Sequence, residues 1–194
     1  MARPLTIGLT GGIAAGKSEA LAAFERLGAE TISSDAVVHE LLDSEPLISR
    51  LTERWGTEVA PDGAVDRTRV GEIVFAAPDE LAWLESQIHP LVGERIGGWL
   101  GSLPEGTAVA VVEVPLLFES GMAGVFDTTV AVVASDPVRS ARAEARGHAL
   151  VGEREARQLA QDEKASRAEH VVENDGTIDD LERELSTLVA KLKR

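Results

Sequence analysis

The chain has 194 residues, of which 44% are hydrophobic, and its formal net charge is −14. This length is enough for one sizeable core with a small appended lobe. The acidic balance argues against broad nucleic-acid binding, and the absence of cysteine excludes disulfides and thiolate metal sites. No apolar run approaches the roughly 20 residues of a membrane helix, and the N-terminus lacks a signal-peptide pattern. We therefore expect a cytoplasmic protein without nucleic-acid or membrane partners.

The first apolar run, Leu5–Leu9, leads directly into a glycine-rich segment. Residues 11–18 read Gly-Gly-Ile-Ala-Ala-Gly-Lys-Ser and have the Gly-x4-Gly-Lys-Ser pattern of a phosphate-binding loop. In such a loop backbone N–H groups face phosphate oxygens, Lys17 reaches the terminal phosphates, and the Ser18 hydroxyl binds Mg²⁺. The apolar spacing of residues 20–27 predicts a helix after the loop, whose positive N-terminus adds to the anion site.

The alternative for this segment is a glycine-rich turn that only resembles the motif. We predict that the loop and the residue after it form the nucleotide-binding site, which comprises Gly11, Gly12, Ala14, Ala15, Gly16, Lys17, Ser18 and Glu19.

Five short apolar runs without polar alternation predict the strands of a parallel sheet that is covered on both faces. They are Leu5–Leu9, Ala29–Ser33, Ala108–Val114, Thr129–Ala134 and His170–Val172. Helical segments separate them, which indicates a doubly wound α/β fold. The clearest helix has an apolar stripe over residues 178–192 and follows a capping box of Thr177 and Asp180.

About seventy residues without a good strand separate the second and third strands. They contain four predicted helices, Asp35–Leu42, Glu45–Trp55, Arg67–Phe75 and Asp79–Leu100. The dipeptide His89-Pro90 is expected to close a helix, because proline disfavours helical geometry in the preceding residue. An insertion of this size predicts a helical lobe over the carboxyl edge of the sheet, where ligands bind in such folds. A lobe that serves only packing is the alternative.

Two carboxylates are expected at that edge of the sheet. Asp35 follows the second strand, and a carboxylate there suits the role of base toward an attacking hydroxyl. A cap of the next helix is an equally simple role for Asp35. Glu113 ends the third strand, where phosphate-loop enzymes hold the hydration shell of Mg²⁺. The alternative is a carboxylate that is merely exposed at the strand end.

Residues 139–167 concentrate cations in an otherwise acidic chain. The segment holds Arg139, Arg142, Arg146, Arg154, Arg157, Lys164 and Arg167. Taken alone, such a run indicates a solvated helix with mixed charge.

The order of motifs along nearly the whole chain resembles the dephospho-coenzyme A kinase family. The resemblance rests on residues 10–18, Ser34-Asp35, Asp66-Arg67, 73–75, Trp83-Leu84, 88–91, 114–119 and 171–176. It implies a three-layer α/β P-loop kinase fold with a five-stranded parallel sheet, an inserted helical acceptor-binding lobe and a helical lid. The single domain 1–194 would then comprise a core of 1–34, 106–138 and 168–194, the lobe 35–105 and the lid 139–167.

The resemblance also implies an activity and roles for residues. ATP, with Mg²⁺, would phosphorylate the ribose 3′-hydroxyl of dephospho-CoA and give coenzyme A. Asp35 would be the base on that hydroxyl, and the lid would close on ATP phosphates. The implied catalytic residues are Asp35, Lys17, Arg142 and Arg146; the implied acceptor-binding residues are Asp35, Arg67, His89 and Pro115. Asn174 and Gly176 would lie beside the adenine, Ser18 and, through water, Glu113 would hold Mg²⁺, and the protein would be a monomer or a weak homo-oligomer.

The chain departs from the family pattern at several positions. Ala14-Ala15 replaces the usual Gly-Ser of the loop, Glu19 replaces a threonine near the α-phosphate, and Ser33 replaces an aspartate. The lid is also shorter than the family's. Two other functions are compatible with a phosphate loop: a P-loop kinase with a nucleoside or nucleotide acceptor, and a GTP-hydrolysing switch. The switch lacks its Asn-Lys-x-Asp element, because residues 173–176 read Glu-Asn-Asp-Gly.

Overall fold

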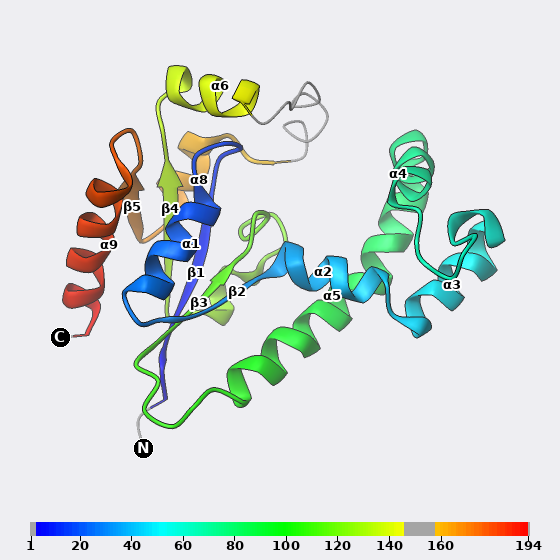
Figure 1. Cartoon of the computed structure of the whole chain (residues 1–194), viewed down its shortest axis with the longest axis horizontal. Coiled ribbons are helices and arrows are strands. Elements are labelled where there is room, and N and C mark those ends of the chain that lie inside the picture. The colour runs from blue at the N-terminus through cyan, green and yellow to red at the C-terminus, as the bar shows by residue number, and fades with distance from the viewer. Residues whose placement is uncertain (1–2, 146–157, 194) are drawn as a thin grey trace. The chain divides into compact units, whose positions relative to one another are not determined.

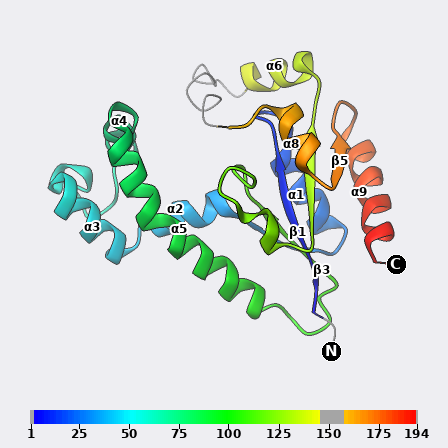
Figure 2. The same cartoon turned by 180° about the vertical axis from the view of Figure 1, so that it is seen from behind.

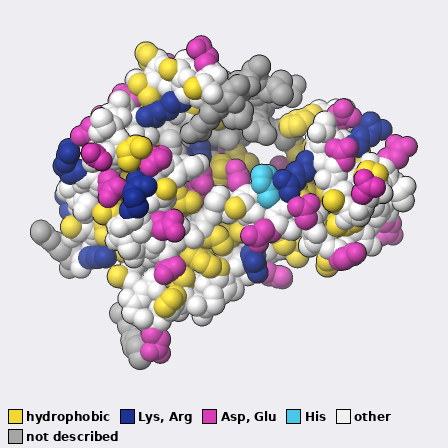
Figure 3. Space-filling view, in the orientation of Figure 1, with side chains coloured by type: hydrophobic (Ala, Val, Ile, Leu, Met, Phe, Trp, Pro, Cys, Tyr) yellow, Lys and Arg dark blue, Asp and Glu magenta, His cyan; other side chains and the backbone are white. Residues whose placement is uncertain are grey.

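The structure is a computed structural model that describes residues 3–145 and 158–193. The chain divides into two compact units. The first comprises Met1–Ser33 and Leu103–Arg194, and the second comprises Ser34–Ser102. Basic and acidic side chains are interspersed on the face shown in Figure 3. Within the described ranges, no helix combines the length and apolar character needed to cross a membrane.

The first unit is built on a five-stranded parallel sheet with the strand order β2-β3-β1-β4-β5. The strands are β1 (Leu5–Gly11), β2 (Glu30–Ser33), β3 (Val109–Glu113), β4 (Thr128–Val133) and β5 (His170–Glu173). All five predicted strands are therefore confirmed, to within two residues at each end. Because β1 lies between β3 and β4, the segment that leaves it emerges where the strand order reverses, which is the usual ligand position in open α/β sheets.

Helices cover both faces of this sheet. Helices α1 (Lys17–Arg26) and α9 (Ile178–Leu192) pack against each other on one face, and α8 (Gln161–Arg167) lies on the opposite face (Figures 1 and 2). Helix α6 (Asp136–Ala145) follows β4, and a short 3₁₀ turn, η2 (Met122–Val125), precedes that strand. The capping box of Thr177 and Asp180 begins α9 as predicted.

The core of the first unit lies between the sheet and the α1–α9 layer. It is formed by fully buried aliphatic side chains of β1, β3 and β4 with Phe24 of α1 and Leu185 of α9. This packing explains why the strands read as continuous apolar runs, since both of their faces are covered.

The second unit is entirely helical. It contains α2 (Ser34–Leu42), α3 (Glu45–Trp55), a 3₁₀ turn η1 (Thr57–Val59), α4 (Arg67–Ala76) and α5 (Pro78–Gly101). Helix α5 is the longest and packs against both α2 and α4. Asp66 caps α4, because its Oδ1 accepts hydrogen bonds from the backbone N–H groups of Thr68 and Arg69.

The predicted helix Asp79–Leu100 is confirmed as α5, whereas the helix end expected at His89-Pro90 is wrong, because α5 continues through Pro90 to Gly101. Proline removes one backbone donor and normally costs a helix interior about 3 kcal/mol. Here Leu84, Ile88, Val92 and Ile96 form one buried stripe along α5, whereas Pro90 lies on the exposed side. Tertiary packing on both sides of Pro90 outweighs the local signal.

Candidate active site

The segment between β1 and α1 has the backbone of an anion-binding loop. The chain leaves β1 at Gly11 and enters α1 at Lys17, with Gly16 as the N-cap in a left-handed conformation (φ 99°). Lys17 folds back over the loop, and its Nζ donates hydrogen bonds to the carbonyl oxygens of Gly11 (3.3 Å) and Gly12 (3.0 Å). The lysine charge and the N-terminus of α1 therefore lie at the same loop, as a polyphosphate ligand requires.

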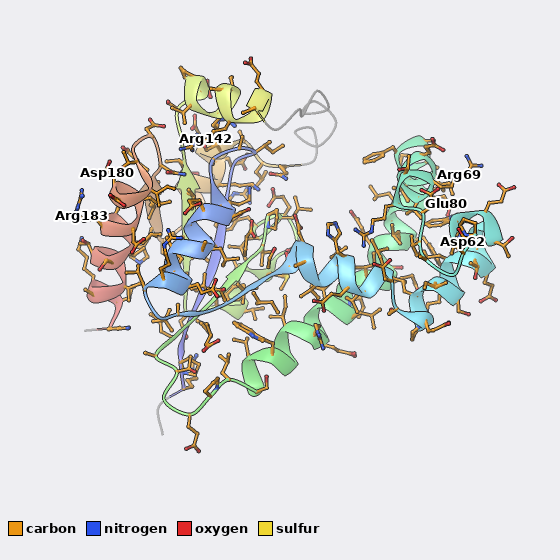
Figure 4. All side chains as sticks on the ribbon, viewed as in Figure 1. Asp62, Arg69, Glu80, Arg142, Asp180 and Arg183 are labelled. Carbon is orange, nitrogen blue, oxygen red and sulfur yellow. The ribbon has the colours of Figure 1, made fainter. Side chains whose placement is uncertain are left out.

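Two side chains from distant elements hold the loop at Ala15. The buried Asn174, which follows β5, donates its Nδ2 hydrogen to the carbonyl oxygen of Ala15 at 2.8 Å. Arg142 of α6 approaches the same oxygen at 3.3 Å, and Figure 4 shows it beneath α6. A Cβ atom at position 16 would lie 2.1 Å from Asn174 Nδ2, so Gly16 is required by this close approach as well as by its φ.

Gln161 and Arg139 flank the loop at Gly12, and the sequence did not predict this position for either. A Cβ atom at Gly12 would lie 3.1 Å from Gln161 Oε1 and 3.4 Å from Arg139 Nη1. The Gln161 amide is fixed by two 3.0 Å hydrogen bonds with the backbone of Ala134. Arg139 pairs with Asp136 at 2.8 Å, while its buried Nε has no hydrogen-bond partner among the described residues.

Glu19, the acidic departure from the family pattern, pairs with a residue of its own helix. Its Oε1 accepts a hydrogen bond from Arg26 Nη2 at 3.0 Å, and Arg26 Nε donates to Glu182 Oε2 of α9 at 2.8 Å. Two hydrogen bonds raise the pKa of the Arg26 guanidinium, and the bond to Glu182 contributes more than the bond to Glu19. The Glu19 carboxylate is thus held toward the C-terminal end of α1.

Ser18 and Glu113 offer hard oxygen donors of the kind that Mg²⁺ prefers. Ser18 is the exposed second residue of α1. Glu113 ends β3 opposite Leu9 of β1 and is only 6% exposed, so the alternative of an exposed strand-end carboxylate is wrong. In the described part of the chain no three His, Cys, Asp or Glu side chains form a metal cage. This donor set suits Mg²⁺, which keeps several waters and binds through one or two protein groups plus substrate phosphates.

The sequence places Lys164 among the cations of the predicted lid, but the structure buries it completely. Its Nζ forms an ion pair with Glu119 (3.2 Å) and donates to the carbonyl oxygen of Pro115. Burial lowers the pKa of the Lys164 ammonium, and the charge of Glu119 opposes that shift. Glu119 also accepts the backbone N–H of Leu159 at 2.8 Å, and Thr10 donates to Pro115 at 3.2 Å. Lys164 therefore joins α8 to the segment after β3.

The predicted adenine loop is fixed by two adjacent side chains, Asn174 and Asp175. Asn174 binds the phosphate loop as described, and Asp175 Oδ1 accepts the backbone N–H of Ser135 at 2.7 Å. A Cβ atom at Gly176 would lie 2.9 Å from Asp180 Oδ2, so the capping box of α9 alone requires a small residue there.

The predicted acceptor residues Asp35, Arg67 and His89 all belong to the second unit. Asp35 lies exposed in the first turn of α2, inside a helix that already begins at Ser34 and not at the cap position. Arg67 begins α4 and donates to Asp43 Oδ2 at 2.8 Å, and His89 is exposed on α5. The lid residues Arg146, Arg154 and Arg157 lie outside the described residues.

Comparisons with known proteins bear on the whole chain. A family profile described as dephospho-CoA kinase matches residues 5–180. The dephospho-CoA kinase of Streptomyces avermitilis is 38% identical over 193 residues, which are 97% of this chain and 94% of that protein.

Solved structures agree with this match. A crystal structure from Thermus thermophilus has a TM-score of 0.85 and 34% identity, and covers 98% of this chain and 99% of its own. The dephospho-CoA kinase from Campylobacter jejuni, at 24% identity, shares the fold with a TM-score of 0.72 over 97% and 96% of the two chains. Because the profile and the Streptomyces relative both span nearly the full length, the chain belongs to the dephospho-CoA kinase family.

Proposed function

We propose that this chain transfers the terminal phosphoryl group of ATP to the ribose 3′-hydroxyl of dephospho-CoA, which yields coenzyme A and ADP. The observation that carries the proposal is the phosphate loop itself, with Lys17 folded over it and the N-terminus of α1 beneath it, in a chain of this family. Phosphoryl transfer depends mainly on positioning and charge stabilisation, and this loop supplies both.

In this proposal the loop binds the triphosphate. Backbone N–H groups of residues 11–18 and the Lys17 ammonium bind the phosphates, and Arg142 and Arg146 stabilise charge on the transferred group. The contact of Arg142 with Ala15 supports its part, because the guanidinium already lies at the loop. Arginine suits this task because its planar fork binds phosphate oxygens in pairs. The segment of Asn174 and Gly176 is proposed to lie beside the adenine.

Mg²⁺ is proposed to bind at Ser18 and, through water, at Glu113. When bound, it would neutralise charge on the phosphate oxygens. Glu113 is well suited to order the hydrating water, because it is buried at the carboxyl end of the strand next to β1.

Asp35 is proposed as the base of the reaction. It accepts the proton of the attacking 3′-hydroxyl as the oxygen bonds to phosphorus and the bond to ADP breaks. Its exposed position in the first turn of α2 leaves the carboxylate accessible to a ligand. Arg67, His89 and Pro115 are proposed to bind the acceptor; Asp43 orients Arg67, and Lys164 and Thr10 fix the carbonyl of Pro115.

The proposal is tested by ADP release from Mg-ATP in the presence of dephospho-CoA, nucleosides, nucleoside monophosphates or no acceptor, with product mass read in parallel. We expect release with dephospho-CoA alone and a product that is one phosphate heavier. Lys17→Ala serves as the control and should lose both nucleotide affinity and rate. Turnover of a different acceptor would refute the assigned substrate. In a parallel assay with Mg-GTP, hydrolysis without any acceptor would favour the switch.

A further inference from the structure

Glu19 creates an electrostatic problem for a nucleotide. It is the third residue of α1, directly after Lys17-Ser18, and lies in the first turn of the helix at the phosphate loop. A carboxylate in the first turn is favourable for the empty helix, because it complements the positive N-terminus. It repels a bound triphosphate for the same reason, since both anions compete for one positive helix end.

Arg26 is placed to reduce this repulsion. It lies seven positions after Glu19, almost two full helical turns, so both side chains share one face of α1. The two nitrogens of Arg26 bind different carboxylates, Nη2 with Glu19 at 3.0 Å and Nε with Glu182 at 2.8 Å. Because Glu182 belongs to α9, the guanidinium is anchored from a second helix and draws the Glu19 carboxylate along α1. Figure 3 shows basic side chains lying among acidic ones over α1 and α9.

We propose that Arg26 is a positioning residue for nucleotide affinity: it binds the Glu19 carboxylate on the side of α1 and lowers its repulsion of the phosphates. This inference rests on the proposed binding of ATP at the loop. The ion pair is partly solvated, with Arg26 42% exposed, so its effect on folding is small. Its effect on nucleotide affinity is larger, because without Arg26 the Glu19 carboxylate would be an unpaired anion beside the phosphates.

A double-mutant cycle of Arg26→Gln and Glu19→Thr tests the proposal. The Kd for Mg-ATP is measured by calorimetry, KM and kcat by ADP release, and Tm by thermal unfolding. We expect Arg26→Gln to raise Kd and KM for ATP by roughly 3- to 10-fold with little change in kcat, and more strongly at low salt. In the Glu19→Thr background, Arg26→Gln should change the Kd and KM for ATP by less than about 1.5-fold, because the carboxylate that Arg26 pairs with is absent.

Arg183→Gln is the matched control. Arg183 also lies on a helix of the first unit, α9, and pairs with Asp180 at 2.9 Å, but it is 73% exposed and does not contact Glu19. The substitution removes the same charge and should leave the ATP constants unchanged. A loss of affinity with Arg183→Gln equal to that with Arg26→Gln would mean that net charge alone is responsible.

An equal effect of Arg26→Gln in the wild-type and Glu19→Thr backgrounds would overturn the proposal, and so would an unchanged Kd in the wild-type background. The calorimetric arm requires no acceptor. If dephospho-CoA is not phosphorylated but the cycle still shows coupling in Kd, the proposed substrate fails and the role of Arg26 stands.

Discussion

Ala14 has a left-handed backbone conformation in the phosphate loop, with φ 59°. A side chain there costs about 1–2 kcal/mol, because Cβ approaches the following carbonyl oxygen. We therefore expect Ala14→Gly to stabilise the protein by roughly 0.5–1 kcal/mol, after the greater chain entropy of glycine is deducted. Urea unfolding measures the change.

The neighbouring alanine provides the control for this prediction. Ala15 is fully buried and does not have a positive φ. Ala15→Gly should destabilise the protein by about 0.5–1 kcal/mol or more. The substitution removes a buried methyl group and raises the conformational entropy of the unfolded chain. The same sign of change for both variants would refute the assignment of strain to Ala14.

Asp35 is the residue on which the proposed chemistry depends most. Asp35→Asn keeps the size of the side chain but cannot accept the hydroxyl proton, so kcat should fall by roughly 100-fold or more. The affinity for ATP, measured by calorimetry, should change little. Asp79→Asn alters another exposed aspartate of the same unit and should retain full turnover. Near wild-type turnover of Asp35→Asn would remove this residue from the mechanism.

The ion pair of Lys164 and Glu119 connects two elements, α8 and the segment after β3. Removing one partner of a buried pair leaves an uncompensated charge and typically costs about 3–5 kcal/mol. We expect Lys164→Met to lose stability in that range in urea, because Glu119 is itself largely buried. The double variant Lys164→Met with Glu119→Leu should recover most of the loss. A double variant as unstable as the single one would show that the packing of Lys164, and not its charge, is what matters.

For helices and strands, the sequence predicts those features that depend on residues close together in the chain. The strands are evident because both faces of the sheet are buried, and α9 is evident because its cap and its apolar stripe are local. Pro90 misleads for the complementary reason, since α5 continues through it on the strength of packing against two other helices, α2 and α4. The phosphate loop is predictable because glycine spacing, Lys17 and Ser18 are all contiguous.

The supports of the loop are harder to predict. The roles of Arg142 and Asn174 are implied only by the family resemblance. Their contact with Ala15 depends on α6 and the end of β5 meeting the loop in space. Lys164 looks like any surface cation in a basic segment, and only the tertiary structure shows that it is buried. Gln161 gives no signal in the sequence at all, because its partner is the backbone of Ala134.

For the molecule as a whole, Asp127 links the start of the chain to β4 and makes stability depend on pH. Hydrogen bonds from Arg3 and from the backbone N–H of Thr6 lower the pKa of Asp127 from 3.8 to about 2. A depressed pKa contributes stability that is fully present above pH 4 and is lost as pH falls toward 2.

Asp127→Asn should therefore cost about 1–2 kcal/mol at pH 7 and progressively less below pH 4. Urea midpoints of wild type and variant, measured from pH 7 to pH 3, should converge toward the acid end. Asp62→Asn, at an exposed turn, should follow the wild-type curve throughout. A constant difference at every pH would mean that the carboxylate charge of Asp127 contributes nothing.

The two outer strands of the sheet, β2 and β5, are only four residues long. Each carries an exposed glutamate, Glu30 at the start of β2 and Glu173 at the end of β5. An unpaired strand edge is a template for aggregation, and short length with charged side chains limits how far another chain can pair with it. At high protein concentration, the edges of the sheet at β2 and β5 are therefore too short and too acidic to seed a continuous intermolecular β-sheet.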